Sequence, residues 1–246
     1  MTERPDPGPT PVGGRSDRAA DRPLVAVLDY GIGNLRSAQK ALQRVGADAR
    51  LTADPEVVAA ADGVVLPGVG AFGRCMEALA EVGLADVAAD AVRDAVAGGR
   101  PFLGVCIGMQ MLFEGSDETP GVPGLGVLPG WVRRLPDGVK HPQMQWNVLD
   151  WRRRPSIAVH LPEPSWVYFV HSYAADVPDD LIVATCDYGG PVTAMVERGR
   201  CRATQFHPEK SGAVGLALLR GFVAECAASS AAGSPSPREP HPAYRT

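Results

Sequence analysis

The chain has 246 residues, which is enough for one large domain or two small ones. Hydrophobic residues make up 45% and charged residues 21%, an ordinary balance for a globular chain. The net charge of −4 gives no global attraction to nucleic acid or to an anionic membrane, so neither partner is expected. The apolar runs are strand-sized, shorter than the ~20 residues of a membrane helix, and the acidic, Pro-rich start does not resemble a secretory signal.

The cysteines stand singly, at Cys75, Cys106, Cys186, Cys201 and Cys226. No C-x-x-C pair occurs and the number is odd, which argues against a disulfide framework and against a zinc site. We therefore expect reduced thiols in a cytoplasmic protein, with no metal and no cofactor. The segment 31–34, Gly-Ile-Gly-Asn, is similar to the start of a dinucleotide-binding loop, but the third glycine is missing at the required spacing.

Both ends of the chain differ in composition from the middle. Residues 1–22 and 228–246 combine prolines, glycines, serines and charges without an apolar period, so we expect two disordered tails. The segment 23–227 contains no Pro/Ser-rich linker and no repeat, which favours a single domain.

The first half of this segment alternates strand and helix patterns. Strands are expected at 24–28, 49–52, 63–66 and 101–105. Helices are expected at 34–45, 73–81, 84–97 and 107–113. Such alternation is typical of a parallel sheet with helices on both faces.

The second half is rich in strands separated by short turns. Strands are expected at 127–135, 146–151, 166–171, 181–187, 193–198 and 201–206. Neighbouring strands with short turns are antiparallel, and a last helix at 212–227 is expected to return to the sheet. The sequence thus predicts an α/β fold, with a mixed, mainly parallel sheet flanked by helices and an antiparallel β-rich C-terminal half.

A strand–turn–helix with the pattern G-x-C-x-G spans 104–108. This is the cysteine form of the nucleophile elbow, in which Gly104 and Gly108 avoid collisions at a sharp turn. The start of a helix favours a thiolate at Cys106, and the N–H of Ile107 would face an oxyanion. The alternative interpretation is that Cys106 is a small buried apolar residue.

A candidate base for this thiol is His207, which Glu209 follows two residues later. In an extended segment these two side chains share one face, and Pro208 restricts the backbone between them. Glu209 is therefore expected to support His207 as the base and acid for Cys106. A histidine at a strand end without a catalytic role is the alternative.

A glycine-containing loop at 65–72 follows an expected strand. Ligands bind at the carboxyl ends of strands in open α/β sheets, and two glycines let the backbone approach a substrate. An ordinary strand-to-helix connection is the alternative.

Three segments, 67–72, 104–110 and 207–211, together resemble the class I (triad) glutamine amidotransferase family. Segments 29–34 and 168–173 narrow the resemblance to its branch of imidazole glycerol phosphate synthase glutaminase subunits, from histidine biosynthesis. The resemblance covers about 23–227 and implies a flavodoxin-like fold. It also implies hydrolysis of L-glutamine to glutamate and ammonia. A (β/α)₈ cyclase subunit, joined in a heterodimer, would use the ammonia to make imidazole glycerol phosphate and aminoimidazole carboxamide ribotide.

The resemblance also implies roles for individual residues. Cys106 would be the nucleophile, His207 the base and acid, and Glu209 its supporting carboxylate. The oxyanion hole would involve Ile107, Val69 and Gly70. The glutamine-binding residues would be Gln110, Glu118, His171, Ser172 and Tyr173. The surface facing the cyclase would include Asn34, Trp146, Tyr168 and Lys210.

One segment departs from the family pattern. Members of the family usually read P-H-M-G-W-N, whereas this chain has P-Q-M-Q-W-N at 142–147, with Gln145 in place of glycine. The change concerns the interface and leaves the triad in place. Three other functions remain open: a triad glutaminase serving another synthase, a silent subunit that only regulates a partner, and a thiol hydrolase such as a peptidase.

Overall fold

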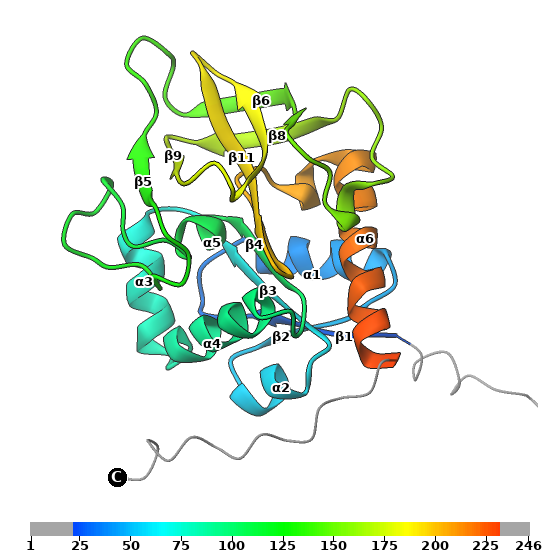
Figure 1. The fold of residues 1–246 in the computed structure, drawn as a ribbon. Helices are drawn as coiled ribbons and strands as arrows, with labels where there is room; N and C mark the ends of the chain where they lie inside the picture. The colour runs from blue at the N-terminus through cyan, green and yellow to red at the C-terminus, as the bar shows by residue number, and fades with distance from the viewer. Residues whose placement is uncertain (1–21, 232–246) are drawn as a thin grey trace, which may run out of the picture.

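The computed structural model describes residues 22–231, shown in Figure 1. Apart from Arg22 and residues 228–231, the two expected tails lie outside the described residues. The elements of the first half are β1 (Leu24–Leu28), α1 (Leu35–Arg44), β2 (Asp48–Thr52), α2 (Pro55–Ala60), β3 (Gly63–Gly68), α3 (Phe72–Glu81), α4 (Ala85–Val96), β4 (Phe102–Cys106) and α5 (Ile107–Gln110). Most bounds lie within one or two residues of the expected ones, while α5 ends three residues earlier.

Helix α2 was not expected, although its N-terminus has a readable signal. The side chain of Asp54 accepts a hydrogen bond from the N–H of Glu56 at 2.9 Å, and Pro55 stands at the first helical position. Both features are typical of helix starts. The helix is only six residues long, too short to show an apolar period.

The elements of the second half are β5 (Trp131–Arg134), β6 (Gln143–Val148), β7 (Asp150–Trp151), η1 (Ser156–Ala158), β8 (Trp166–His171), β9 (Tyr173–Asp176), β10 (Ile182–Asp187), β11 (Pro191–Arg198), β12 (Cys201–Thr204), η2 (Pro208–Lys210) and α6 (Gly212–Ala231). Three expectations are wrong in detail. Of the strand expected at 127–135, only β5 forms, because Gly130 has a φ of 134° and interrupts the extended backbone before it. The strand expected at 146–151 is divided between β6 and β7, which join different sheets. The strand expected at 201–206 ends at Thr204.

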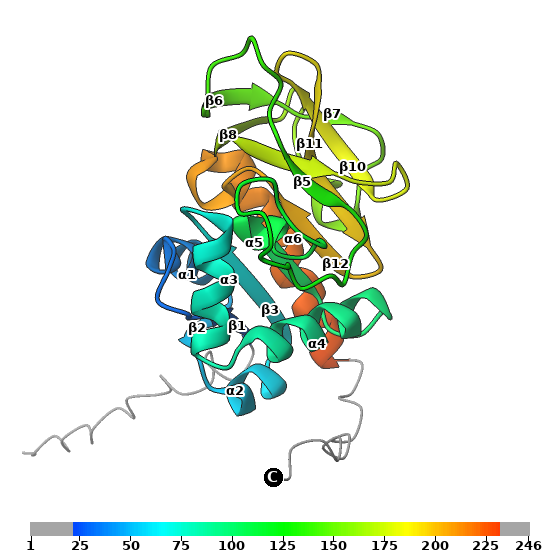
Figure 2. The same cartoon turned by 90° about the vertical axis from the view of Figure 1, so that its left-hand side faces the viewer.

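An eight-stranded mixed sheet forms the centre, in the order β2-β1-β3-β4-β12-β11-β10-β7. Strands β2, β1, β3, β4 and β12 are parallel, whereas β11, β10 and β7 continue the sheet with antiparallel pairing. β12 therefore joins the two halves, because it pairs in parallel with β4 and antiparallel with β11. Two antiparallel ribbons, β5–β9 and β6–β8, lie beside the strands of the C-terminal half (Figure 2).

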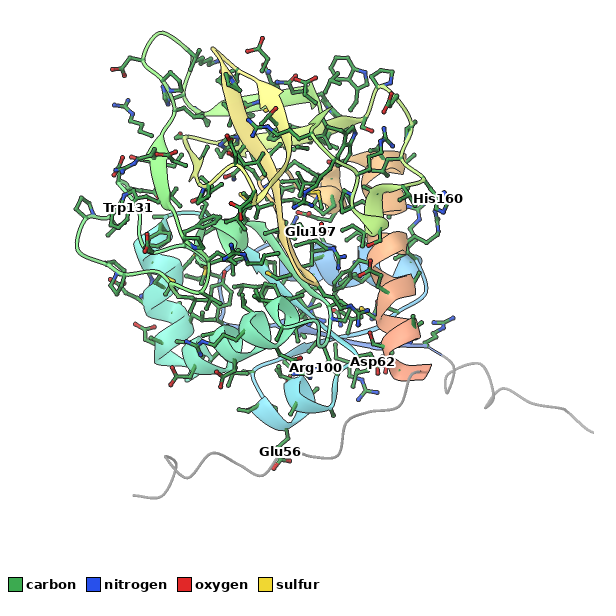
Figure 3. The ribbon with its side chains drawn as sticks, viewed as in Figure 1. Glu56, Asp62, Arg100, Trp131, His160 and Glu197 are labelled. Carbon is green, nitrogen blue, oxygen red and sulfur yellow. The ribbon has the colours of Figure 1, made fainter. Side chains whose placement is uncertain are left out.

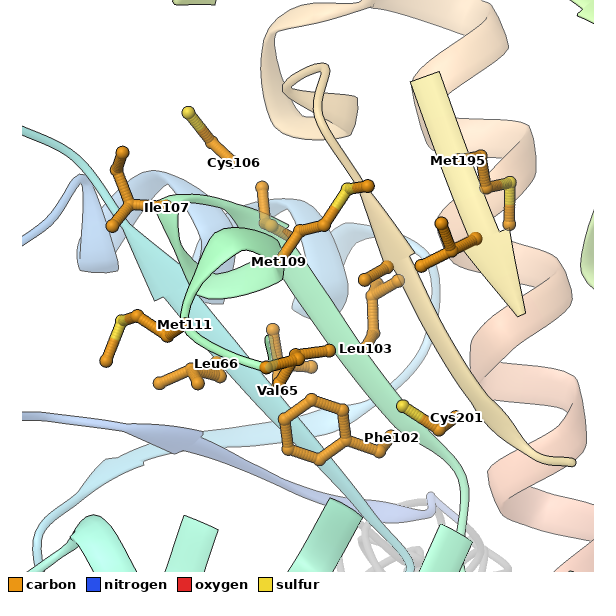
Figure 4. Packing of buried hydrophobic residues seen from close by; sticks show 14 of the residues in the cluster. Val65, Leu66, Phe102, Leu103, Cys106, Ile107, Met109, Met111, Met195 and Cys201 are labelled. Carbon is orange, nitrogen blue, oxygen red and sulfur yellow. The ribbon is translucent and has the colours of Figure 1, made fainter. Parts of the chain in front are cut away.

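The parallel strands read as near-continuous apolar runs because helices cover the sheet. Helices α1 and α6 pack together against β1, and α4, which packs with α3, contacts β4 and β12. Val65, Leu66, Phe102 and Leu103 of β3 and β4 are at most 1% exposed and pack below the elbow (Figure 4). This packing fixes the carboxyl ends of β3 and β4, where the site is built.

Helix α6 continues to Ala231, so residues 228–231 are helical and not part of a disordered tail. Its segment Gly212–Ser230 has the length and composition of a membrane-spanning helix, longer than the strand-sized apolar runs expected from the sequence. However, Leu218, Leu219 and Phe222 are buried, and α6 contacts α1, β1 and η1. One face of α6 therefore packs against the body of the molecule.

Arg202 of β12 lies at the centre of a buried ionic network. Its guanidinium group donates to Glu197 at 2.8 Å, to Glu225 of α6 at 2.6 Å and to Ser156 at 3.0 Å. The side chains of Arg202 and Glu197 are only 6% and 15% exposed. The network thereby connects β12, β11, η1 and α6.

Replacing Arg202 with methionine is expected to lower the free energy of unfolding by about 3 kcal/mol, because the poorly solvated carboxylate of Glu225 would lose its cationic partner and Glu197 would keep only Arg153. Urea unfolding would measure the change. Arg74→Met is the matched control, since Arg74 is more than half exposed and its pairs with Glu77 and Glu81 lie in solvent. Equal losses in the two variants would contradict a structural role for the network.

Candidate active site

Cys106 occupies a strained turn between β4 and α5. Its φ of 57° makes it the only non-glycine residue with positive φ within the described chain. The turn depends on Gly108, because a Cβ there would lie 1.8 Å from the carbonyl oxygen of Leu66. A Cβ at Gly104 would lie 2.8 Å from the carbonyl oxygen of Gly108. Figure 4 shows the Cys106 side chain pointing away from the packed residues, as a nucleophile elbow requires.

The imidazole of His207 is held by Glu209. Nδ1 of His207 lies 2.8 Å from Oε1 of Glu209, and the two side chains are 2% and 4% exposed. The sequence predicted that the pair would form in an extended segment, and this is wrong in detail. Pro208 starts the short helix η2, and Glu209 lies on that turn. Nε2 of His207 is buried and has no partner, so this nitrogen is available to another group.

Cys106 and Glu209 both affect the pKa of His207. Burial alone would lower the pKa of His207, but the nearby Cys106 and the bond with Glu209 outweigh it and raise the pKa to about 9. A raised pKa favours the protonated imidazole, the form that can give a proton to a leaving group.

A cavity of about 560 Å³ opens above Cys106 and His207. Its wall includes Gly33, Asn34, Val69, Gly70, Cys106, Ile107, Gln110, Glu118, Pro142, Val170, His171, Ser172, Tyr173, His207 and Lys210. Of the site residues expected from the sequence, only Glu209, Trp146 and Tyr168 do not line it. Among residues 22–231, no three His, Cys, Asp or Glu side chains group as metal ligands.

The loop after β3 forms one wall of the cavity. The hydroxyl of Tyr30 donates to the carbonyl oxygen of Pro67 at 2.6 Å, and the thiol of Cys75 donates to that of Val69 at 3.3 Å. Gly70 has a φ of 89°, a conformation that favours glycine. Val69 and Gly70 thus line the same cavity as Ile107, and two side chains hold carbonyl groups of their loop.

Gln110 and His171 share one backbone acceptor. Nε2 of Gln110 lies 3.0 Å from the carbonyl oxygen of Tyr173, and Nδ1 of His171 lies 2.9 Å from the same oxygen. Both side chains are nearly fully buried, and their other polar atoms, Oε1 of Gln110 and Nε2 of His171, have no partner. The cavity wall thus carries two acceptors that a ligand with N–H groups would satisfy.

Glu118 contributes the carboxylate of the cavity wall. Its Oε2 accepts a hydrogen bond from the N–H of Phe72 at 2.7 Å, at the start of α3. This bond holds the side chain in place, and its other oxygen is free to meet a cation.

The residues expected at an interface divide between the cavity mouth and a neighbouring ribbon. Asn34 and Lys210 lie at the cavity. Trp146 and Tyr168 face each other across β6 and β8, with ring centroids 6.0 Å apart, and Trp146 is 48% exposed. Trp146 is therefore not a core residue.

The sequence between 26 and 226 matches the family model described as glutamine amidotransferase class-I. The chain belongs to this family. It is 48% identical over 200 residues to the imidazole glycerol phosphate synthase subunit HisH of Methanothermobacter thermautotrophicus, covering 81% of this chain and 98% of the relative. It is 46% identical to the HisH subunit of Geobacter sulfurreducens over 207 residues, covering 80% and 97% of the two chains. This amidotransferase therefore also belongs with the HisH subunits.

Solved structures support the fold of this class-I amidotransferase. A crystal structure of a glutamine amidotransferase superposes with a TM-score of 0.64 at 23% identity, covering 82% of this chain and 98% of that one. The PurLQS structure from Thermotoga maritima gives a TM-score of 0.61 at 19% identity, with the same coverage. The expected fold class is thereby confirmed.

Two residues beside the site carried no sequence signal of their own. Gln205 lies next to the motif at 207–211, and Cys75 lies on α3; only the folded chain brings them to Cys106 and to the loop after β3. Gln145, the residue that replaces glycine in this amidotransferase, is exposed opposite Phe169 on the β6–β8 ribbon. Its side chain therefore fits without displacing the ribbon.

His171 is expected to make this amidotransferase sensitive to acid. Burial, with the nearby charge of His207, lowers the pKa of His171 to about 4 despite its bond to Tyr173. In the unfolded chain its pKa would be about 6.5, so between these values the unfolded state binds the extra proton. His171 contributes about 3 kcal/mol to the free energy of unfolding above pH 6.5, and this contribution is lost as the pH falls toward 4.

Urea unfolding of the wild type and of His171→Gln between pH 7.5 and 4 would test this expectation. The variant should lose less stability on acidification than the wild type does. His160→Gln is the control, since His160 is exposed near the surface (Figure 3). Parallel curves for the wild type and the His171 variant would contradict the assignment.

Proposed function

We propose that this chain is the glutaminase subunit of an imidazole glycerol phosphate synthase, acting in histidine biosynthesis. The observation that carries the proposal is the pairing of Cys106, on its strained elbow, with a His207 that Glu209 holds at 2.8 Å, both in one cavity. The HisH relatives, which match over almost their whole length, name the synthase. A cytoplasmic location fits five cysteines that are all free and buried.

In the proposed reaction the sulfur of Cys106 attacks the side-chain amide carbon of glutamine. The resulting oxyanion lies against the N–H of Ile107 and the loop at Val69 and Gly70. His207 gives its proton to the departing nitrogen, so ammonia leaves and a glutamyl thioester remains. Water then adds to the thioester, with His207 taking its proton, and glutamate and the free thiol are formed. Glu209 keeps Nε2 of His207 directed toward the sulfur.

The polar groups of the cavity wall suit glutamine. The free oxygen of Glu118 pairs with its α-ammonium group, and Oε1 of Gln110 accepts from an N–H of the substrate. The backbone of 171–173 supplies the remaining contacts, since Ser172 and Tyr173 line the same wall.

The decisive experiment is a glutaminase assay with and without the cyclase subunit and its ribotide substrate. We expect glutamate release that the cyclase and ribotide stimulate. Release that ignores the ribotide would favour a glutaminase that serves another synthase. The absence of release under every condition would favour a silent regulatory subunit.

We further propose that the partner is a (β/α)₈ cyclase that covers the cavity mouth and receives the ammonia. The ribbon β6–β8 presents Met144, Trp146 and Trp166 with exposed fractions of 61%, 48% and 49%. All three alternate onto the same face of the ribbon, beside Asn34 and Lys210 at the mouth. An exposed aromatic patch next to an active site is typical of a docking surface.

Replacing Trp146 with alanine is therefore expected to raise the Kd for the cyclase about 30-fold, as for an aromatic hot-spot residue. Titration calorimetry would measure the affinity. Val82→Ala is the control, because Val82 is also exposed but follows α3 and does not line the cavity. An unchanged Kd for the Trp146 variant would place the docking surface elsewhere.

A further inference from the structure

Gln205 is a fully buried residue whose side chain lies between Cys106 and Gln110. We infer that Gln205 is a positioning residue of the glutaminase site. The carbonyl oxygen of its amide orients Gln110 toward the substrate, and its NH₂ group directs an N–H at the sulfur of Cys106. The inference rests on the proposed function, because it assigns a role within that reaction.

The backbone of Gln205 is fixed. The residue follows β12 directly, and its N–H donates to the carbonyl oxygen of Ala194 on β11 at 2.9 Å. Its side chain is 0% exposed, so packing restricts it to one rotamer. A residue held in this way can impose an orientation on its neighbours.

Hydrogen-bond directions determine how the two amides face each other. The carbonyl oxygen of Tyr173 only accepts, so the group that faces it at 3.0 Å must be the NH₂ of Gln110. The same nitrogen lies 3.0 Å from Oε1 of Gln205. Both protons of the Gln110 amide are thus used within the protein.

The opposite orientation of Gln205 is excluded by this arrangement. A reversed amide would direct its NH₂ at the NH₂ of Gln110, and two donors would meet without an acceptor in a buried site. In the observed orientation Nε2 of Gln205 faces Cys106, with the nitrogen 3.7 Å from the sulfur. The hydrogen bonds that link Tyr173, Gln110, Gln205 and Cys106 therefore have only one possible set of donors and acceptors.

At the Gln110 end, this direction leaves Oε1 of Gln110 without a partner in a residue that lines the cavity. The atom is buried. An acceptor that is unsatisfied in the free site favours a ligand that donates an N–H, and disfavours one without such a donor. L-Glutamine has donors in its ammonium and amide groups, whereas glutarate, of similar length, has neither.

At the Cys106 end, the N–H of Gln205 favours negative charge on the sulfur. Hydrogen bonds to the charged form of a group stabilise that form, and the thiolate is the nucleophile. Gln205 thus acts on both binding and attack, although it does not line the cavity.

Alkylation of Cys106 by iodoacetamide reports both effects without turnover. The full-length chain is titrated between pH 5 and 10, without ligand and with increasing L-glutamine, and Cys106 modification is followed by mass spectrometry. The other four thiols are buried and do not line the cavity, and burial raises the pKa of Cys186 to about 11 and of Cys201 to about 12, so they react slowly.

Gln205→Met is expected to shift the alkylation midpoint of Cys106 to higher pH and to raise the glutamine concentration for half-protection about tenfold. Gln143→Met is the matched control. Gln143 is likewise 0% exposed, and its amide lies 3.7 Å from a cysteine sulfur, but that sulfur belongs to Cys186 outside the cavity. Wild-type values of both quantities in Gln205→Met would overturn the inference.

A double variant tests whether Gln205 acts through Gln110. The protection constant of Gln110→Met/Gln205→Met should equal that of Gln110→Met, because the orientation of Gln110 no longer matters. Full addition of the two single effects would overturn the inference.

If circular dichroism shows that Gln205→Met does not fold, Gln205→Glu replaces it: its carboxylate still accepts from Gln110 but cannot donate to the sulfur. Protection should then stay near the wild type while the alkylation midpoint rises, and unchanged alkylation would overturn the inference.

The outcomes for the two proposals are distinguishable. Suppose that glutamine protects the wild type and that Gln205→Met has its expected effects, but that no glutamate is released with the cyclase and ribotide. This result would contradict only the proposed function. Normal glutamate release, together with a Gln205→Met variant whose alkylation midpoint and glutamine protection equal the wild-type values, would contradict only the role of Gln205. In the active complex, Gln205→Met should raise KM and lower kcat, whereas Gln143→Met should change neither.

Discussion

Replacing Cys106 with alanine is expected to lower kcat for glutamate release by about 10⁴-fold or more, with the cyclase and ribotide present. Loss of a catalytic nucleophile leaves only the binding and oxyanion contributions of the site. Alanine has the same backbone restrictions as cysteine at a φ of 57°, so the strain of the elbow remains unchanged. Glutamate release, measured by a coupled assay, should vanish while the circular dichroism spectrum stays that of the wild type.

Cys226→Ala is the matched control for this variant. Cys226 is fully buried on α6, outside the cavity, so its loss should reduce stability and leave kcat near the wild type. Glutamate release by Cys106→Ala within tenfold of the wild-type rate would be incompatible with a covalent thioester at this residue.

The sequence predicted the first half of the fold well because each element there carries its own signal. β1 and β3 are apolar runs bounded by turns, and α1, α3 and α4 repeat apolar residues at helical spacing. The second half was predicted less well. β6 and β7 are separated by one residue but belong to different sheets, a division that depends on tertiary pairing and not on local pattern.

The candidate site shows the same limit. The glycines around Cys106 indicated the elbow, and the structure gives the reason in the collisions that a Cβ at 104 or 108 would cause. The spacing of His207 and Glu209 indicated their contact, although through a helical turn rather than an extended segment. Gln205 is 95 residues from Gln110 and 99 from Cys106 in sequence, and no local pattern relates such distant positions.

Gly108→Ala is expected to lower the free energy of unfolding by about 3 kcal/mol or more. The added Cβ would lie 1.8 Å from the carbonyl oxygen of Leu66 and 2.8 Å from its carbonyl carbon. Both are backbone atoms of β3, which is paired with β4, so they cannot move aside as a flexible side chain would. Urea unfolding would measure the loss, and glutaminase activity should fall even at temperatures where the variant is folded.

Gly83→Ala separates this steric effect from a general cost of replacing glycine. Gly83 follows α3 with a φ of 73°, and a Cβ there would meet no atom within 4 Å. Its replacement costs only backbone strain, about 1 kcal/mol, and should leave activity unchanged. Gly108 has no such positive φ, so its loss acts through the contact between α5 and β3. Because Leu66 directly precedes the loop that holds Val69 and Gly70, displacing β3 would separate the oxyanion loop from Cys106. Equal stabilities and activities of the two variants would show that this contact does not set the geometry of the site.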